Sequence, residues 1–555
     1  MKNYILGLSG ICLVFFLLIW GNWSISLWDE DEAAYALFGQ NMLQTGDWVE
    51  PQATWSDIHR KTPFHFWTIS LSYLIFGVNE WAVRFPAVVA ILATLGLVFG
   101  IVRRFFSSAL AWGAVWVLGT SIFVPTLAKI SLTDAWLLFA TTAAMGTLYG
   151  YLQTRAWVWL LGFTAAVGLG VLVKGPPVLI LAGGVWLGLL IFSQKRAWLL
   201  DWKLFLFGFL SILPFVAWMY ASYQKDGGVF LSFLYDWYVA KRVGGSVLGQ
   251  SGWAGYHLGM LHLAFLGFLP MLWLFFGAQL GGSVLIFKSW KTLPENAREN
   301  YLFAGLWLFW GWIFYELMSS KLPSYSLAVH PLLGIFIAHT AQNMLASAQV
   351  SRFWAWACGV YGLIWMAFAG ALLVAPHLEI LKVFNLNIWA SLPAAVFILI
   401  MLVWMLKSGW TLARMGILSA GTQLLVWMFA APQVEQSPVK SFPKIPLFFA
   451  ETPNCQPKHF HLVGMHTKQT RPSLLFYLKN ATHTETTIAQ ADSILQIIDN
   501  QAVKNPCEEV FILGTEADSL YQKIKTQPNL HIRRLDWVST DDKFKPHTFV
   551  IVWKK

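Results

Sequence analysis

Residues 29–32, Asp-Glu-Asp-Glu, place four consecutive carboxylates directly after the first apolar segment of the chain. Residues 4–20 carry no charged side chain, and with an extension to Trp23 the segment is long enough to cross a bilayer. The four acids therefore lie at the boundary between lipid and water, whichever side of the membrane they reach. A carboxylate there can exchange a proton with a membrane-bound substrate. The pattern indicates an enzyme.

Further acidic and basic residues stand where later apolar segments end on the side of these acids. They are Arg60 and Lys61, Lys129 and Asp134, Lys174, Lys241 and Arg242, and Lys321 with Tyr325. Fixed cations of this kind can meet the charge that develops on a phosphate leaving group. The elements that bring them together must be membrane helices and the turns between them.

The composition excludes an ordinary soluble globule, because 57% of the 555 residues are hydrophobic and 12% are charged. The 32 tryptophans agree with many helix ends at a membrane interface, where Trp is favoured. The net charge of +10 comes from basic residues in short loops, so we interpret it as anchoring to anionic lipid and not as nucleic-acid binding. The N-terminus has no small-residue cleavage site, and we expect its helix to be retained.

Hydropathy predicts about thirteen transmembrane helices. Their expected ranges are 4–23, 81–101, 109–127, 134–152, 157–173, 177–193, 203–222, 257–286, 301–318, 325–341, 353–375, 387–406 and 411–431. Two shorter stretches, 32–45 and 64–76, are predicted to be interfacial helices in the first external loop. Asp31 can cap the first of them and Gly46 can end it.

The loop charges orient the chain. With the N-terminus in the cytoplasm, most loop Lys and Arg residues lie inside and most acids lie outside, as the positive-inside rule requires. Thirteen crossings then put the C-terminal tail outside, in the periplasm of a Gram-negative cell. The predicted location is the bacterial inner membrane.

The fold class is predicted to be mainly α, with a transmembrane domain at 1–431 and a small external α/β domain at 432–555. Four prolines between residues 432 and 446 mark the change in composition. Within the tail, strands are expected at 459–463, 510–513 and 549–552, and helices near 472–479 and 517–526. Cys455 and Cys507 both fall in this domain, where a disulfide between them is left open.

Several motifs occur in a fixed order along the chain. They are Asp31-Glu32-Ala33-Ala34-Tyr35-Ala36, Gly46-Asp47-Trp48, Lys61-Thr62-Pro63, the KLPSY of residues 321–325 and the PSLLFYL of residues 472–478. This order resembles the polytopic, lipid-dependent glycosyltransferases of the GT-C class. The likeness is greatest to the aminoarabinose transferases that act on lipid A and to the protein O-mannosyltransferases. Because the motifs span nearly the whole chain, the resemblance implies a GT-C fold throughout.

Two positions depart from the family pattern. The relatives usually carry Arg where this chain has Ala34, and Glu where it has Arg60. In the aminoarabinose transferases that Glu, with a loop His, resembles a metal site. With Arg60 in its place we assign no metal ligand here; no cofactor is certain, a divalent metal ion is left open, and the sugar stays undetermined.

The resemblance implies a donor sugar carried on polyprenyl phosphate, because nucleotide sugars are absent outside the cytoplasm. The phosphate leaving group then needs cations in a partly dry site, where they act more strongly than in water. The candidates are Lys61, Arg242 and Lys321, with Arg60 beside Lys61, and Tyr325 can add a hydrogen bond.

Asp31 is the predicted general base, which takes the proton from the acceptor hydroxyl, and Asp134 and Glu32 assist it. The resemblance implies a single inverting displacement without a covalent sugar–enzyme intermediate. Structural roles stay open for the same residues. Asp31 and Asp134 can be helix caps, Glu32 a supporting residue and Lys61 an interfacial lysine.

We therefore predict a membrane glycosyltransferase whose partners are the polyprenyl-phosphate sugar, membrane lipids and an outer-leaflet or periplasmic acceptor. That acceptor is lipid A, another glycolipid, a polysaccharide or a protein. One alternative is a transporter or flippase of lipid-linked sugars, which should place ionisable residues or broken helices near the bilayer midplane. The other is a non-catalytic envelope-assembly protein. Charges gathered at helix ends argue against the first, and cations recurring in four outer loops argue against the second.

Overall fold

The structure is a computed structural model of the chain. It describes residues 2–28, 31–51, 61–236, 251–277, 293–346, 352–451, 457–463, 472–480, 485–489, 508–514, 521–525 apart from 523, 529–538 and 546–554. Arg60 and Arg242 lie outside these ranges, as do Cys455 and Cys507.

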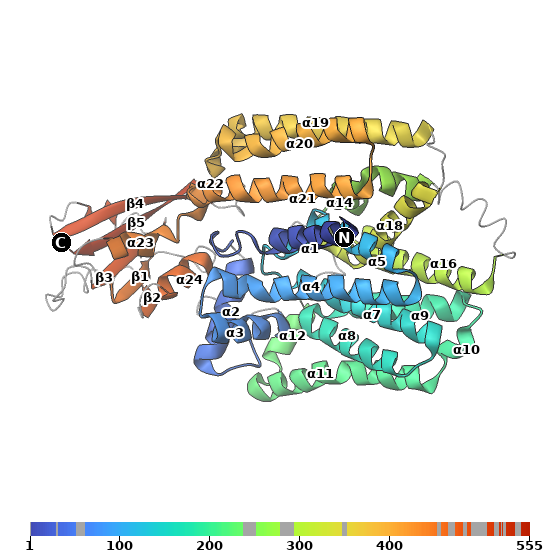
Figure 1. Ribbon diagram of the computed structural model, residues 1–555. Helices are drawn as coiled ribbons and strands as arrows, with labels where there is room; N and C mark the ends of the chain where they lie inside the picture. Colours follow the sequence, from blue (N-terminus) through green and yellow to red (C-terminus); the bar gives the residue numbers. More distant parts are fainter. Residues whose placement is uncertain are drawn as a thin grey trace.

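Helices make up most of this part of the chain, and long ones run side by side with a small sheet at one end (Figure 1). The helices before the sheet are α1 (Lys2–Ile19), α2 (Asp31–Thr45), α3 (Phe64–Phe76), α4 (Glu80–Phe105), α5 (Ser108–Thr120), α6 (Phe123–Leu127), α7 (Asp134–Thr154), α8 (Val158–Lys174), α9 (Pro176–Phe192), α10 (Arg196–Leu199), α11 (Trp202–Asp226), α12 (Val229–Tyr235), α14 (Tyr256–Ala264), α16 (Glu295–Leu308), α17 (Phe314–Glu316), η5 (Pro323–Val329), α18 (His330–Ala346), α19 (Arg352–Val374), α20 (Ile388–Ser408), α21 (Leu412–Phe429), α22 (Ala431–Glu435), η8 (Pro438–Lys440) and α23 (Lys444–Glu451).

Five helices among the described residues are long and apolar enough to cross a membrane, or six if one bent pair counts as a span. They are α4, α11, α19 extended to His377, α20, and α21 extended to Glu435; the bent pair is Tyr256–Ala264 with Leu266–Gly277. The chain is therefore a multi-pass membrane protein by the length and composition of its helices. The predicted number of thirteen crossings stays a prediction.

Some of the predicted membrane spans are interrupted, and prolines explain the positions of the interruptions. The stretch 109–127 divides into α5 and α6, because the ring of Pro125 clashes with a helical carbonyl at Ser121. The stretch 257–286 bends by 72° after Ala264, where Gly267 and Pro270 follow. In the stretch 325–341 the α-helix begins only at His330, with Pro331 in its first turn.

The two short helices predicted at 32–45 and 64–76 are present as α2 and α3, and their interfacial, external location stays a prediction. Helix α2 begins at Asp31 itself, so this residue is its first helical residue and not the cap before it. Gly46 follows the helix with a φ of 72°, the left-handed conformation that glycine adopts without steric cost and that ends helices. Their close packing is visible at Gly39, where an added Cβ would lie 2.7 Å from Cγ2 of Ile69.

The C-terminal sheet has the strand order β2-β1-β3-β5-β4. The strands are β1 (His459–Val463), β2 (Glu485–Ala489), β3 (Glu509–Leu513), β4 (Leu530–Val538) and β5 (Pro546–Lys554). β1 pairs in parallel with β2 and β3, whereas β5 is antiparallel to β3 and β4. The predicted strands correspond to β1, β3 and β5, and the helix near 472–479 is α24 (Pro472–Asn480). The helix near 517–526 lies partly outside the described residues.

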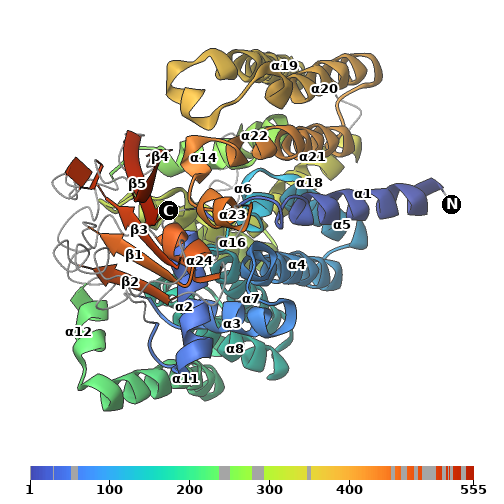
Figure 2. The same ribbon diagram turned by 90° about the vertical axis from the view of Figure 1, so that its left-hand side faces the viewer.

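One hydrophobic cluster joins α2 and α3 to this C-terminal region. It combines Tyr35 and Phe38 of α2 with Phe442, Phe460 and Leu475. The view toward the sheet shows α2 and α24 side by side in front of the long helices (Figure 2). The cluster positions α2 from both sides, because α3 packs on one face and the C-terminal region on another.

Candidate functional site

The predicted general base, Asp31, is the first residue of α2, a helix held in place by its neighbours. Asp31 is exposed, whereas the next nine residues of α2 are buried. Two hydrogen bonds from α3 hold the middle of α2: Ser70 Oγ donates to the Gly39 carbonyl at 2.8 Å, and Tyr73 Oη donates to the Ala36 carbonyl at 3.1 Å. The Asp31 carboxylate is therefore solvent-accessible and is carried by a helix whose backbone is held in place, as a general base requires.

Glu32 has different surroundings, because it is buried in an ion pair with Arg84 of α4. Both side chains are 1% exposed, and Nε and Nη2 of Arg84 donate to the two carboxylate oxygens at 2.9 Å each. The backbone N–H groups of Trp28 and Ser131 donate to the same carboxylate, also at 2.9 Å. Burial raises the pKa of Glu32, but Arg84 and these N–H groups outweigh it and the pKa is lowered overall. The carboxylate is therefore ionised and fully engaged, which favours the supporting role.

Lys61 and Asp134 lie close to α2. The Lys61 ammonium is 5.5 Å from the ring centroid of Tyr35, one helical turn after Asp31. Lys61 is also close enough to Asp134 to interact electrostatically with it. Lys61 precedes α3 and Asp134 begins α7, so separate turns converge near Tyr35, one turn along α2 from Asp31.

Asp134 forms an ion pair with Lys174, one of the cations expected where an apolar segment ends. Lys174, at the end of α8, donates to Oδ1 of Asp134 at 2.8 Å, and both side chains are largely buried. Ser324 of the KLPSY motif also donates to the Asp134 carboxylate. Asp134 therefore orients a basic neighbour, as one of its predicted roles requires, and connects α7, α8 and η5.

Lys321, at the start of the same motif, is compensated by Glu316. Its Nζ donates to Oε1 and to the backbone carbonyl of Glu316, both at 2.9 Å, and the side chain is 8% exposed. Nδ1 of His257 lies 2.9 Å from the other oxygen of Glu316, and the ring of Tyr325 stacks on the imidazole with centroids 6.3 Å apart. Lys321 and Tyr325 thus belong to a second cluster, which Ser324 links to Asp134. Their contact with a donor phosphate stays a prediction.

His65, near the start of α3, packs among aromatic side chains. The side chain is fully buried, with its ring 5.4 Å from Tyr35 and its Nε2 3.3 Å from Ser131 Oγ. No group of three or more His, Cys, Asp or Glu residues in the described ranges could hold a metal ion.

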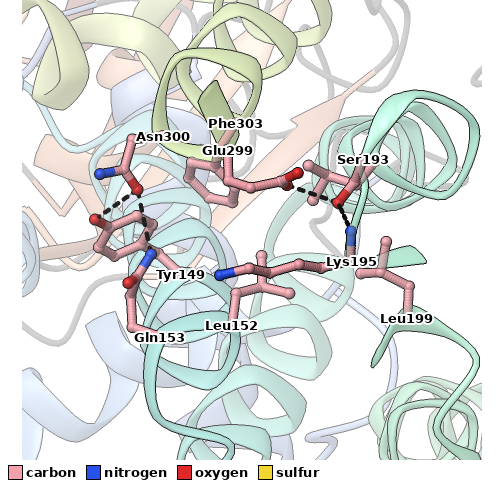
Figure 3. A pocket seen from close by; sticks show the side chains of 10 residues that line it. Tyr149, Leu152, Gln153, Ser193, Lys195, Leu199, Glu299, Asn300 and Phe303 are labelled. Atoms are coloured by element: carbon pink, nitrogen blue, oxygen red, sulfur yellow. Dashed lines mark hydrogen bonds between the residues drawn. The ribbon is translucent and has the colours of Figure 1, made fainter. Parts of the chain in front are cut away.

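A small cavity of about 20 Å³ lies far from these residues, at the end of α7 opposite Asp134. Figure 3 shows Tyr149, Gln153 and Asn300 hydrogen-bonded on one side of it and Glu299 bound to Ser193 on the other. This volume is close to that needed for one water molecule. The residues that line the cavity make polar contacts between α7, α9 and α16. The cavity itself is too small for a sugar.

Sequence reasoning missed Arg84 as a partner of Glu32. The available signal was an arginine inside the apolar helix α4, since a charge within a membrane-length segment is costly and is usually paired. It also left Lys174 unassigned, because nothing in the sequence shows that Lys174 and Asp134 meet.

The fold and these motif residues resemble one class of protein, the lipid-dependent glycosyltransferases with many membrane helices. Residues 60–220 match the family model described as dolichyl-phosphate-mannose-protein mannosyltransferase. Over its whole length the chain superposes on the crystal structure of ArnT from Cupriavidus metallidurans bound to undecaprenyl phosphate. The TM-score is 0.68 at 19% identity, covering 99% of this chain and 98% of that one. The chain therefore has the ArnT fold.

Curated relatives are similar in sequence. Two are named undecaprenyl phosphate-alpha-4-amino-4-deoxy-L-arabinose arabinosyl transferases. The protein from Pseudomonas fluorescens Pf0-1 is 27% identical over 62% of this chain and 60% of its own length. The one from Aeromonas salmonicida A449 is 27% identical over 63% of each. The aligned region thus spans less than two thirds of these relatives. The resemblance predicted from the motifs is confirmed.

Proposed function

We propose that the protein is a membrane glycosyltransferase that moves a sugar from a polyprenyl-phosphate donor to an acceptor hydroxyl. The observation that carries the proposal is the arrangement around Asp31. An exposed carboxylate on a fixed helix lies one turn from Tyr35, over which the Lys61 ammonium is placed. The ArnT fold supports the same activity, and the named relatives give the donor class, undecaprenyl phosphate carrying a sugar.

In this mechanism Asp31 takes the proton from the acceptor as the hydroxyl oxygen attacks the anomeric carbon. The bond from that carbon to the phosphate oxygen breaks, and polyprenyl phosphate leaves with its negative charge. Lys61 meets that charge, together with Arg242, Lys321 and Tyr325; each cation contributes about 10²–10³ in rate if it acts like an oxyanion donor. Asp134 forms an ion pair with Lys174 and also interacts with Lys61, which keeps a second ammonium near the site.

We also propose the topology that this chemistry needs. The loop charges put the N-terminus in the cytoplasm and place Asp31, Lys61 and Asp134 on the periplasmic side of the inner membrane, and thirteen crossings put the C-terminal tail on that side too. Residues 1–431 form the transmembrane domain and residues 432–555 the periplasmic domain. The acceptor is then an outer-leaflet or periplasmic molecule, and the relatives make lipid A the first to test.

A transfer assay tests the proposal. Purified protein is incubated with radiolabelled undecaprenyl-phosphate aminoarabinose, and separately with undecaprenyl-phosphate mannose, in the presence of a Gram-negative membrane extract. We expect a labelled product with one donor and none from Asp31→Asn. Absence of product with both donors contradicts the proposed donors, and unchanged turnover in Asp31→Asn removes Asp31 from the base role.

A further inference from the structure

The connecting segment, residues 20–28, joins α1 to the helix that begins with Asp31, and its last three residues are held by the C-terminal region. Glu435 of α22 accepts from both the backbone N–H and the hydroxyl of Ser26, each at 2.9 Å. Tyr477 of α24 accepts from the Leu27 N–H at 2.7 Å and donates to Glu80 at 3.0 Å. Residues more than 400 positions away in sequence thus determine the path of the chain just before the base.

Among these C-terminal residues, Lys440 of η8 makes the most contacts with the connecting segment. The side chain is 3% exposed, and its Nζ donates to the carbonyls of Ser26 at 2.8 Å and Leu27 at 2.9 Å. The same ammonium lies 3.7 Å from the ring centroid of Trp28, a cation–π contact. A buried ammonium carries a large desolvation cost, so these contacts must be well formed for the side chain to stay there.

The contacts leave no backbone freedom between residues 26 and 28. Every N–H and carbonyl of these three residues has a partner, because Trp28 donates to Glu32 at 2.9 Å and accepts from the Ala33 N–H at 3.1 Å. The Ala33 bond belongs to the first turn of α2. A shift at Ser26 or Leu27 is therefore passed directly to the turn that presents Asp31.

We infer that Lys440 is a positioning residue for the transfer reaction, through which the C-terminal region fixes where the Asp31 carboxylate stands. The inference rests on the proposed function, in which Asp31 is the base. Lys440 itself acts through the connecting segment and does not contact the reacting atoms. Displacing a catalytic group by about 1 Å can cost roughly 100-fold in rate, so a residue remote from the substrate can control turnover.

The test compares three purified full-length variants in the transfer assay. Lys440→Met removes the ammonium and keeps the apolar stem, and we expect kcat to fall by about 10- to 100-fold with little change in the KM for the lipid donor. Lys440→Arg restores a cation that can reach both carbonyls, and we expect it to recover most of the turnover. The matched control is Lys444→Met, because within the part of the chain that the structure describes Lys444 donates to the carbonyls of Gln436 and Ser437 and not to residues 26–28. We expect wild-type kinetics from this variant.

Unfolding temperature is measured for each variant, and if Lys440→Met does not fold, Tyr477→Phe takes its place because it removes the partner of the Leu27 N–H from a different helix. The inference is overturned if the folded variant, Lys440→Met or its replacement Tyr477→Phe, has the wild-type kcat, or if only its KM changes. A loss in Lys440→Met that Lys440→Arg does not reverse also overturns it. If Asp31→Asn is fully active the proposed base fails first, so the two failures are distinguishable.

Discussion

Replacing Glu32 by Gln removes the negative charge from the Arg84 ion pair without changing the size of the side chain. The carboxylate accepts four hydrogen bonds at 2.9 Å, two from Arg84 and one each from Trp28 and Ser131. An amide accepts at its oxygen only, so the two bonds at the other atom are lost and an NH₂ group faces donors there. The Arg84 charge, 1% exposed, loses its counter-ion.

Breaking one partner of a buried ion pair costs about 3–5 kcal/mol, because an uncompensated charge is left in a low-dielectric site. The two lost bonds give a similar figure, since a hydrogen bond to a charged group contributes about 1.5–3 kcal/mol. We therefore expect Glu32→Gln to destabilise the protein by about 3–5 kcal/mol. The double replacement Glu32→Met with Arg84→Met should cost less than the sum of the single changes, because no charge is stranded.

The measurement is unfolding of the purified protein in detergent, followed by tryptophan fluorescence. Glu379→Gln is the matched control, because Glu379 is 85% exposed in its pair with Lys382 and exposed pairs contribute about 0–1 kcal/mol. Turnover per folded molecule is measured beside it. A Glu32→Gln protein that unfolds like the wild type refutes the reasoning. Normal stability with lost turnover would instead make Glu32 catalytic.

The same pair predicts sensitivity to acid. The pKa of Glu32 in the folded protein lies below its ordinary value of 4.5, because burial raises it less than Arg84 and the N–H groups lower it. A depressed carboxylate pKa contributes stability above the unfolded value, and this stability is lost as the pH falls through the folded pKa. We expect the unfolding temperature to decrease below about pH 4.5 and this decrease to be smaller in the double Met variant.

Three further outcomes can be measured. Asp134→Asn and Lys174→Met should each lower turnover by about 10-fold or more, and together by little more than either alone, because they break one ion pair; additive losses in the transfer assay would argue against this coupling. Burial and, to a smaller extent, the Arg84 charge lower the pKa of Lys129 to about 7. The buried ammonium should therefore reduce the stability of the fold below pH 7, and this loss should disappear as the pH rises toward 10.5, the ordinary pKa of lysine. The free energy of unfolding should rise over that interval in the wild type and not in Lys129→Met. Gly39→Ala should destabilise the protein by about 1–3 kcal/mol because of overpacking, since its Cβ would lie 2.7 Å from Ile69; an unchanged unfolding temperature would mean that α3 moves freely.

The sequence by itself determined the local elements and the family resemblance. Apolar runs of membrane length, the strands of the tail and the short helices α2 and α3 depend on composition and on neighbours within a few residues, which a sequence displays directly. The motif Asp31-Glu32 with Lys61-Thr62-Pro63 likewise indicated the resemblance that the comparisons confirm. The sequence also placed Asp31 at the start of a helix, as its cap, whereas the structure has Asp31 as the first helical residue.

Only the tertiary structure decided which charges meet. Glu32 pairs with Arg84 across 52 residues and Asp134 with Lys174 across 40, while Lys440 reaches Ser26 across 414. Such partners are chosen by how helices pack, because burying a charge is tolerated only where packing brings a counter-charge or several carbonyls within reach. Local pattern carries no information on that choice. The sequence could name the residues able to do chemistry, but the packing decided which of them are neutralised and which, like Asp31, remain exposed.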